Sequence, residues 1–259
     1  MSAPPRESPV AVTEPAVPVI SPGPLVPVPD FGPVDRLHGW AVTAVITALA
    51  AATRLVNLGS PTDAGTPIFD EKHYAPQAWQ VLHNHGVEDN PGYGLVVHPP
   101  LGKQLIAIGE AIFGYNGVGW RFTGALLGVI MVGLVVRIVR RISRSTLVGG
   151  IAGLLLIGDG VSFVASRTAL LDGFLTFFVV AAFGALIVDR DQVRERMHIV
   201  LLEDRSAETV WGPRLGVRWW RFGAGVLLGL ACATKWSGLY FVLFFGAMSL
   251  AFDVAARRQ

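Results

Sequence analysis

The sequence has few charged residues and only one cysteine, and each shortage excludes a class of protein. Asp, Glu, Lys and Arg make up 15% of the 259 residues, whereas soluble domains carry about 25%. Hydrophobic residues make up 52% and the mean hydropathy is +0.51, so the chain has too little polar surface to cover a water-soluble globule. A single cysteine, Cys232, excludes a secreted scaffold held by internal disulfide bonds. The composition therefore indicates a membrane protein.

Other signals are also missing from the sequence. There is no Gly-rich phosphate loop and no G-x-S-x-G motif, and the 30 glycines are spread through apolar stretches, where small residues let helices pack closely. No charged segment followed by a short apolar stretch begins the chain, so we predict no signal peptide. The formal net charge of +2 gives no indication of nucleic acid as a partner.

The first 37 residues contain 10 of the 17 prolines and show no apolar period. Such a segment cannot bury enough apolar surface to offset the entropy cost of ordering. We therefore predict a disordered, Pro-rich cytoplasmic tail over residues 1–37 and a membrane-embedded region over residues 38–259.

Five apolar stretches predict an all-α, multi-pass bundle, because a helix needs about 20 mostly apolar residues to cross a bilayer. Four of them have the length of one span, and the fifth has the length of two, with a turn at residues 235–238. The stretches are Trp40–Leu58, Phe122–Val139, Leu147–Ala165, Ala169–Val188 and Val217–Ala256. About six transmembrane helices are expected.

Lysine and arginine are distributed unevenly between these spans, and the asymmetry predicts the orientation. With the tail inside, 15 of the 21 cations lie in cytoplasmic segments and five in outer ones, while Arg54 lies at the outer end of the first span. We predict a protein of the cell membrane with both ends of the chain cytoplasmic and residues 59–121 outside.

The outer segment 59–121 is the longest connection, and loops above about 15 residues are uncommon unless they are functional. It contains four of the six histidines and six acidic residues. Within it, Leu105–Phe113 is apolar but too short to cross a membrane, so we expect a helix lying in the interface. The chemistry is expected on this outer face.

Asp70 and Glu71 place two adjacent carboxylates soon after the first span. A carboxylate near a membrane face has its pKa raised by desolvation and can serve as a base near neutral pH. Adjacent side chains diverge, so one carboxylate is expected to face a reacting group while the other organises the site. The alternative is an ordinary solvated loop.

His98 and Lys103 flank Pro99 and Pro100, which stiffen the backbone and begin the interfacial helix. The prolines would hold the two side chains in a fixed relation near the membrane surface. The alternative is that the prolines only punctuate a loop, with Lys103 extending to the interface.

Charges at the borders of membrane spans are costly, which makes each of them a candidate functional residue. Arg121, Arg167 and Lys235 lie towards the outer face, as do Asp159 and Asp172. Three cations there suit the phosphate of a lipid-linked substrate. The alternative is that these residues pair with one another and hold the bundle together.

The histidines of the outer segment, together with Asp70 and Glu71, are residue types that bind zinc or manganese. Their spacing shows no compact ligand pattern. We therefore predict no metal site.

Five motifs follow one another along the chain. They are Phe-Asp-Glu-x-His-Tyr at 69–74, His-Pro-Pro-Leu-Gly-Lys at 98–103, Arg-Phe-x-Gly-Ala-Leu-x-Gly at 121–128, Ser-Arg-x-x-x-Leu-Asp-x-Phe-Leu-x-Phe-Phe at 166–178 and Lys-Trp-Ser-Gly-Leu-Tyr at 235–240. In this order they resemble the N-terminal part of the bacterial protein O-mannosyltransferases, and the actinobacterial branch above all. These are polytopic glycosyltransferases of the GT-C class, and the resemblance runs from about residue 40 to residue 259.

The resemblance implies a reaction and a role for each motif. Such enzymes transfer mannose from polyprenyl-phosphate mannose to Ser or Thr hydroxyls of exported proteins on the outer face, with inversion and without a cofactor. Asp70 and Glu71 match the catalytic pair, with Asp70 as the base. The expected substrate-binding residues are His98, Lys103, Arg121, Arg167, Asp172 and Lys235. The expected partners are the lipid-linked donor, exported acceptor proteins, the secretion translocon and membrane lipids.

The family usually continues for several more transmembrane helices, so the chain is expected to lack the C-terminal ones. Two alternatives follow: another GT-C enzyme that moves a sugar to lipid or polysaccharide, and an inactive truncated membrane protein. The motif at 98–103 argues against the first. A transporter would place its charges near the membrane midplane and often show inverted repeats, which this sequence lacks.

The orientation is testable by cysteine labelling in a Cys232→Ser background. An impermeant thiol reagent added to intact cells should label a cysteine placed at Asn90 and not one placed at Ser206, because 15 of the 21 cations lie on the side of residue 206. Labelling at 206 without labelling at 90 would reverse the topology.

Overall fold

The computed structural model describes residues 30–60, 66–88, 97–203 and 213–257, which form helices with no strand among them. The helices are α1 (Pro33–Leu55), α2 (Glu71–His83), α3 (Leu101–Phe113), α4 (Gly117–Ser143), α5 (Thr146–Gly158), α6 (Gly160–Arg167), α7 (Leu171–Leu202), α8 (Trp219–Thr234) and α9 (Gly238–Arg257). The predicted all-α bundle is confirmed. Residues 1–29 of the predicted tail lie outside the described residues.

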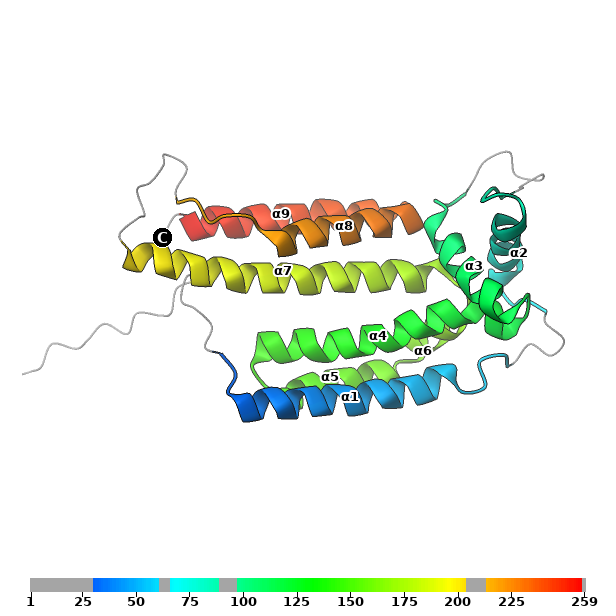
Figure 1. Cartoon of the computed structure of the whole chain (residues 1–259), viewed down its shortest axis with the longest axis horizontal. Coiled ribbons are helices and arrows are strands. Elements are labelled where there is room, and N and C mark those ends of the chain that lie inside the picture. Colours follow the sequence, from blue (N-terminus) through cyan, green and yellow to red (C-terminus); the bar gives the residue numbers. More distant parts are fainter. Residues whose placement is uncertain (1–29, 61–65, 89–96, 204–212, 258–259) are drawn as a thin grey trace, which may run out of the picture.

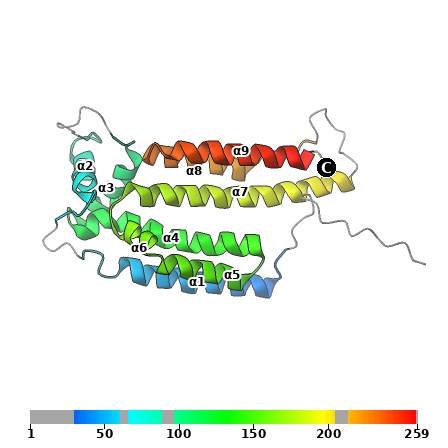
Figure 2. The ribbon, with the colours of Figure 1, turned by 180° about the vertical axis from the view of Figure 1, so that it is seen from behind.

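The long helices lie side by side along one axis, with α2 and α3 across one end (Figure 1). Helix α1 lies with α5 on one side of the bundle, α4 and α7 follow, and α8 and α9 lie on the other side; the view from behind shows the same order (Figure 2). Helix α4 packs against α1, α3, α5, α6 and α7. The two segments between α1 and α4 that carry the predicted chemistry are therefore gathered at one end.

The predicted spans are all present as helices, but they differ in how well they suit a membrane. Helices α4, α7 and α9 are long and apolar enough to cross one, and the bent pair α5–α6 would make a fourth. Within the described residues, α1 and α8 do not meet both requirements, and α8 has only 16 residues. The protein is a multi-pass membrane protein with three or four spans of full length and apolarity.

Two predicted boundaries are wrong. Helix α1 begins at Pro33, where proline is well tolerated in the first turn, so the last five residues of the predicted tail are helical. Helix α7 begins at Leu171 and extends to Leu202, well beyond the predicted end at Val188. Its charged second half still buries Val193, Met197 and Val200, which recur at helical spacing along one face.

The predicted span 147–165 is not one continuous helix, because the helix breaks at Asp159. Helices α5 and α6 meet there at a bend of 64°. The Asp159 carboxylate accepts a hydrogen bond of 2.7 Å from the Ser162 backbone N–H and so caps α6. A glycine on each side of Asp159 weakens the helix locally.

Helix α2 was not expected, and α3 begins at Leu101, four residues before the predicted start. Helix α2 contains Pro76 and buries only small residues and one carboxylate, so it lacks a strong apolar period. It packs into a cluster of buried residues from α2, α3, α4 and the start of α7. These are Ala75, Ala78, Ile106, Ala107, Trp120, Ala169, Leu171 and Phe174.

Two glycines allow α3 to lie close to α4. A Cβ atom at Gly109 would overlap the carbonyl oxygen of Gly119, and one at Gly119 would overlap the carbonyl oxygen of Gly114. Because backbone atoms cannot move aside cheaply, a side chain at either position would push the two helices apart.

We expect Gly109→Ala to destabilise the protein by about 1–3 kcal/mol, the usual cost of overpacking. Gly225→Ala on α8 is the matched control, because no atom lies within 4 Å of its added Cβ and alanine is favoured over glycine in a helix. Thermal unfolding in one detergent measures both. A Gly109 variant as stable as the control would contradict the close packing of α3 on α4.

Candidate active site

A buried ion pair between Glu71 and Arg121 lies where α2, α4 and α7 begin. Arg121 Nε donates to Glu71 Oε1 at 2.6 Å and Nη2 donates to Oε2 at 2.8 Å. Both side chains are 0% exposed. The Glu71 carboxylate also accepts from the backbone N–H of Ile68 at 3.1 Å and of Ala169 at 3.0 Å. Each of its oxygens therefore accepts two hydrogen bonds.

This geometry surrounds Glu71 with structural contacts. Its carboxylate is enclosed, faces a guanidinium and has its acceptor sites occupied, so it cannot meet an acceptor hydroxyl. Glu71 instead ties the start of α2 to α4 and to the segment before α7. Of the two adjacent carboxylates, Asp70 is the more accessible one.

Arg121 and Arg167 both bind backbone carbonyl groups, and their expected contact with a lipid phosphate stays a prediction. Arg121 Nη1 donates to the carbonyl oxygens of residues 58, 59 and 60 at 3.1–3.2 Å. Arg167 donates to those of residues 53, 54, 56 and 57 at 2.8–3.0 Å. A helix end leaves carbonyl groups without intrahelical partners. The two arginines satisfy those at the end of α1 and in the turn that follows.

Asp70 precedes the first residue of α2, and its side chain makes no capping hydrogen bond. It is half-buried. The residue before it, Phe69, has φ of +48° and an exposed side chain. A bulky residue seldom adopts this left-handed conformation, and such strain often marks a functional site. The turn directs Glu71 into the protein and leaves the Asp70 carboxylate at the surface, near the N-terminus of a helix, which favours negative charge.

Tyr74 and His98 lie near Asp70 at this end of the bundle, and Asp172 and Lys235 lie near His98. The Tyr74 and His98 rings lie 6.2 Å apart between centroids. Burial, followed by the negative charges of Asp70 and Asp172, raises the pKa of Tyr74 to about 12. Lys235 Nζ donates to the Asp172 carboxylate at 2.7 Å. Residues from four of the five motifs therefore meet in one cluster.

His98 is set up to be neutral at physiological pH. Burial and the positive charges of Lys235 and Lys103 lower the pKa of His98, and the carboxylates of Asp172 and Asp70 oppose this only in part. Its Nδ1 is buried and has no hydrogen-bond partner among the described residues. A neutral imidazole with an unoccupied nitrogen is able to hold a substrate hydroxyl by a hydrogen bond.

Lys103, also expected to bind substrate, is buried at 2% exposure and forms an ion pair with Glu88. Its ammonium group therefore joins α3 to the segment after α2. Lys235 differs, because its side chain is 26% exposed and that of its partner Asp172 is 60% exposed. Lys235 therefore pairs at the surface near His98, whereas Lys103 pairs in the interior.

A crevice of about 310 Å³ opens between α4, α6 and α7, next to this cluster. Most of its wall is apolar or formed by small residues, such as Gly124, Met131, Ala165 and Val180. Asp172 lines the crevice and also belongs to the cluster around Asp70. The site therefore joins a polar centre to an apolar channel between helices.

Tyr74 and Glu88 contribute to the site but were not predicted as functional residues. Tyr74 follows Asp70 by four residues, which is one turn of a helix, and recognising α2 would have identified it. Nothing in the sequence indicates that Glu88 pairs with Lys103. Within the described ranges, no group of three or more His, Cys, Asp and Glu side chains is arranged to hold a metal ion.

Comparison with known proteins gives relatives for most of the chain. The family model for dolichyl-phosphate-mannose-protein mannosyltransferase matches residues 115–252. A polyprenol-phosphate-mannose–protein mannosyltransferase of Mycobacterium tuberculosis is 87% identical over 246 residues, which are 95% of this chain and 47% of the relative. One of Mycolicibacterium smegmatis is 79% identical over 244 residues, with 94% and 47% covered.

A solved structure has the same fold. The Saccharomyces cerevisiae protein O-mannosyltransferase Pmt1–Pmt2 complex, bound to the sugar donor, matches with a TM-score of 0.65 and 23% identity. The match covers 84% of this chain and 29% of that chain. The chain spans about half the length of the curated relatives it matches.

The structural role of Arg167 is testable by hydrogen exchange. Arg167→Gln should speed amide exchange around residues 53–57, because the carbonyl groups at the end of α1 lose their partner and the last turn opens more often. Saturation with polyprenyl-phosphate mannose, the donor that the resemblance implies, should stay unchanged, whereas Lys235→Gln should weaken it. Weaker donor use with unchanged exchange would return Arg167 to phosphate binding.

Proposed function

Because the chain belongs to the dolichyl-phosphate-mannose-protein mannosyltransferase family, we propose that it transfers mannose from polyprenyl-phosphate mannose to Ser or Thr hydroxyls of exported proteins. The observation that supports this most is the difference in burial and contacts between Asp70 and Glu71. Glu71 is buried against Arg121, while Asp70 is only half-buried and lies near Tyr74 and His98. One carboxylate is thus available as a base and its neighbour holds the base in place.

The reaction follows from this arrangement. The acceptor hydroxyl gives its proton to the Asp70 carboxylate as its oxygen attacks the anomeric carbon of mannose. The bond from that carbon to the phosphate oxygen breaks on the opposite face, and its electron pair leaves with the polyprenyl phosphate, so the configuration inverts. Lys235 turns from Asp172 towards the phosphate and stabilises its charge. Polyprenyl phosphate is a good leaving group, so we propose that no metal or cofactor is required.

The apolar crevice supports a lipid-linked donor. A polyprenyl chain lying between α4, α6 and α7 would end at Asp172, and its phosphate would lie beside Lys235. The Tyr74 hydroxyl and the free Nδ1 of His98 are then the polar groups that hold the acceptor or the sugar. We further propose that the protein lies in the cell membrane with the site facing outward and both ends of the chain in the cytoplasm. Acceptor proteins then reach the site as they leave the secretion translocon.

Asp70→Asn should lower mannosyl transfer by at least about 100-fold, because a placed base typically contributes 10²–10⁴-fold. The assay measures transfer from polyprenyl-phosphate mannose to a Thr-containing peptide. Since the chain spans about half of its relatives, it is run with the chain alone and with a chimera in which the chain replaces the matching half of the Mycolicibacterium smegmatis relative. Glu195→Gln removes an exposed carboxylate from the opposite end of α7 and is the control.

The asparagine variant should keep the thermal unfolding midpoint of the unsubstituted chimera, since Asp70 makes no capping hydrogen bond. Near-normal turnover in the Asp70→Asn chimera would overturn the base assignment. An active chimera with an inactive chain would show that the chain needs the other half of the enzyme. A chimera that glycosylates a lipid or polysaccharide but no peptide would favour a different GT-C reaction.

A further inference from the structure

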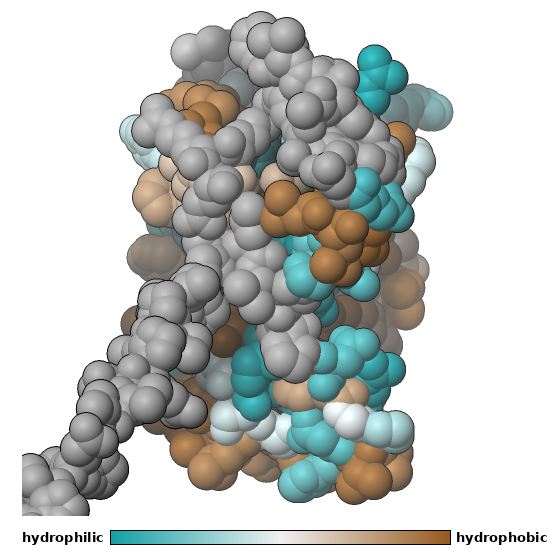
Figure 3. All heavy atoms as spheres, turned by 90° about the vertical axis from the view of Figure 1, so that its left-hand side faces the viewer, coloured by the Kyte–Doolittle hydropathy of each residue, from teal (hydrophilic) through white to brown (hydrophobic). Residues whose placement is uncertain are grey.

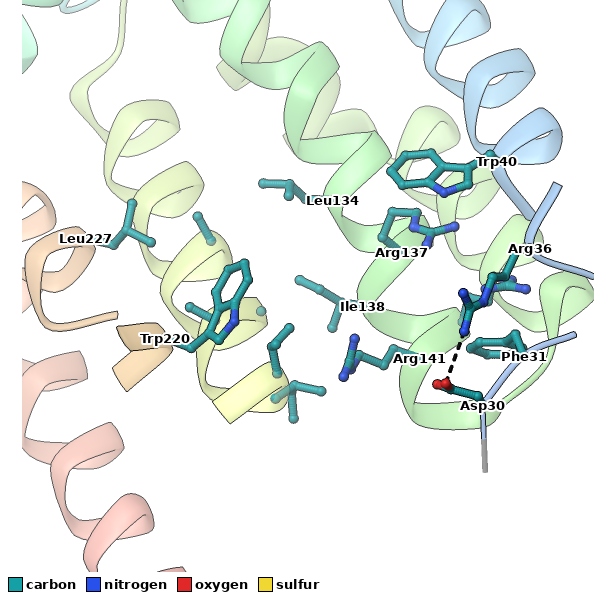
Figure 4. A pocket seen from close by; sticks show the side chains of 16 residues that line it. Asp30, Phe31, Arg36, Trp40, Leu134, Arg137, Ile138, Arg141, Trp220 and Leu227 are labelled. Atoms are coloured by element: carbon teal, nitrogen blue, oxygen red, sulfur yellow. Dashed lines mark ion pairs between the residues drawn. The ribbon is translucent and has the colours of Figure 1, made fainter. Parts of the chain in front are cut away.

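A second and larger cavity lies at the end of the bundle opposite α2 and α3. Its volume is about 580 Å³, and it lies between the α1–α4 side and the α7–α8 side of the bundle. Figure 4 shows Trp220 and Leu227 on one side, with Leu134, Arg137, Ile138 and Arg141 facing them from α4. Phe31 and Trp40 lie beyond α4. None of these residues contributes to the proposed reaction, which takes place at the other end.

Four arginines line this cavity, and three of them have a carboxylate partner. The pairs are Arg36–Asp30 at 3.1 Å, Arg140–Asp35 at 2.8 Å and Arg141–Asp191 at 2.7 Å. The fourth, Arg137, forms no ion pair with any described residue. The lining therefore carries one positive charge that the described part of the protein does not neutralise.

Arg137 is held in the wall of the cavity by an aromatic ring. Its guanidinium carbon lies 3.9 Å from the centre of the Trp40 ring, in a cation–π contact. Its Nη1 is buried and has no hydrogen-bond partner among the described residues. A buried donor without an acceptor is costly, and the cost is larger when the donor is charged. An anion in the cavity would remove that cost.

The rest of the wall is suited to hydrocarbon. It is formed by aliphatic and small residues of α4, α7 and α8, namely Leu134, Ile138, Ala181, Gly184, Ala185, Ile187, Val188 and Leu227. Trp40 and Trp220 are 59% and 46% exposed, and exposed tryptophans at helix ends are typical of the membrane interface. Seen end-on, hydrophilic and hydrophobic residues lie side by side at this end (Figure 3).

We propose that this cavity is a binding site for an anionic phospholipid from the membrane leaflet at this end. The phosphate lies against Arg137 and Arg141, and one acyl chain lies along the aliphatic wall between α4 and α7. A basic pocket between transmembrane helices is the kind of site that holds anionic lipid headgroups. A free phosphate would leave the aliphatic wall bare, and a zwitterionic lipid would bring a second cation next to the arginines that line the cavity.

The position of the site gives the lipid a structural consequence. The cavity is lined by α1 and α4 on one side and by α7 and α8 on the other. A lipid that fills it would tie the two sides together at the end remote from the reaction. Ligands that bind only the folded state raise its apparent stability, so occupancy should be visible in thermal unfolding.

The test uses the purified 259-residue chain, delipidated in a neutral detergent. Native mass spectrometry counts bound phosphatidylglycerol or phosphatidylcholine with the same acyl chains, and thermal unfolding reports the stabilisation. We expect phosphatidylglycerol to bind at least tenfold more tightly than phosphatidylcholine and to raise the unfolding midpoint. Inorganic phosphate at the same concentration should not raise the midpoint.

Three variants separate this site from general surface charge. Arg137→Gln should weaken phosphatidylglycerol binding at least fivefold, and Arg137→Lys should keep most of it. Ala181→Phe fills the apolar wall without changing charge and should also weaken binding. Arg194→Gln is the matched control. Arg194 lies on α7, near the end of the bundle that holds the cavity, but it does not line the cavity.

Several results would overturn the proposal. They are equal affinity for the two lipids, phosphatidylglycerol binding that survives Arg137→Gln, an equal loss in Arg194→Gln, and stabilisation by inorganic phosphate alone. If Arg137→Gln does not fold, Arg137→Lys and Ala181→Phe decide: tight binding in the lysine variant and weak binding in the phenylalanine variant support the site, and any other pattern rejects it.

Discussion

The end of the molecule formed by α2 and α3 depends on the buried ion pair between Glu71 and Arg121. Neither side chain is exposed to solvent, and removing one partner from such a pair typically costs 3–5 kcal/mol because it leaves the other charge buried and unpaired. Backbone groups form hydrogen bonds with both partners. The carbonyl oxygens of residues 58–60 accept from the guanidinium, and the N–H groups of Ile68 and Ala169 donate to the carboxylate. The ion pair connects the end of α1, the start of α2, the start of α4 and the start of α7.

This connection explains why two neighbouring carboxylates have different roles. Glu71 must point inward to meet Arg121, and the strained backbone at Phe69 turns the chain so that it does. Asp70 is then left at the surface, at the first turn of α2 and among groups from α7, α8 and the segment before α3. The position of Asp70 therefore depends on Glu71, and the proposed chemistry depends on the ion pair between Glu71 and Arg121.

The sequence was sufficient for the features that depend on composition and local periodicity. Apolar stretches located the long helices, and the five motifs selected residues that the fold brings to one end. It was not sufficient where a residue's partner is distant in the chain. Arg121 and Arg167 looked like phosphate ligands because an idle charge at a membrane surface is costly. Both donate to backbone carbonyl groups more than 60 residues away, and Arg121 also pairs with Glu71; no local pattern reveals these contacts. The sequence does not predict helix α2, because this helix buries alanines and a carboxylate instead of an apolar stripe.

A double-mutant cycle on Glu71 and Arg121 tests most directly whether this pair organises the end of the bundle formed by α2 and α3. Glu71→Gln, Arg121→Gln and the double variant are unfolded reversibly in mixed micelles, and the coupling energy is the departure of the double variant from the sum of the singles. The account predicts that each single variant loses several kcal/mol and that the double variant is less destabilised than their sum by at least about 1 kcal/mol. Additive losses, with a coupling energy near zero, would show that the two side chains act independently and would contradict it.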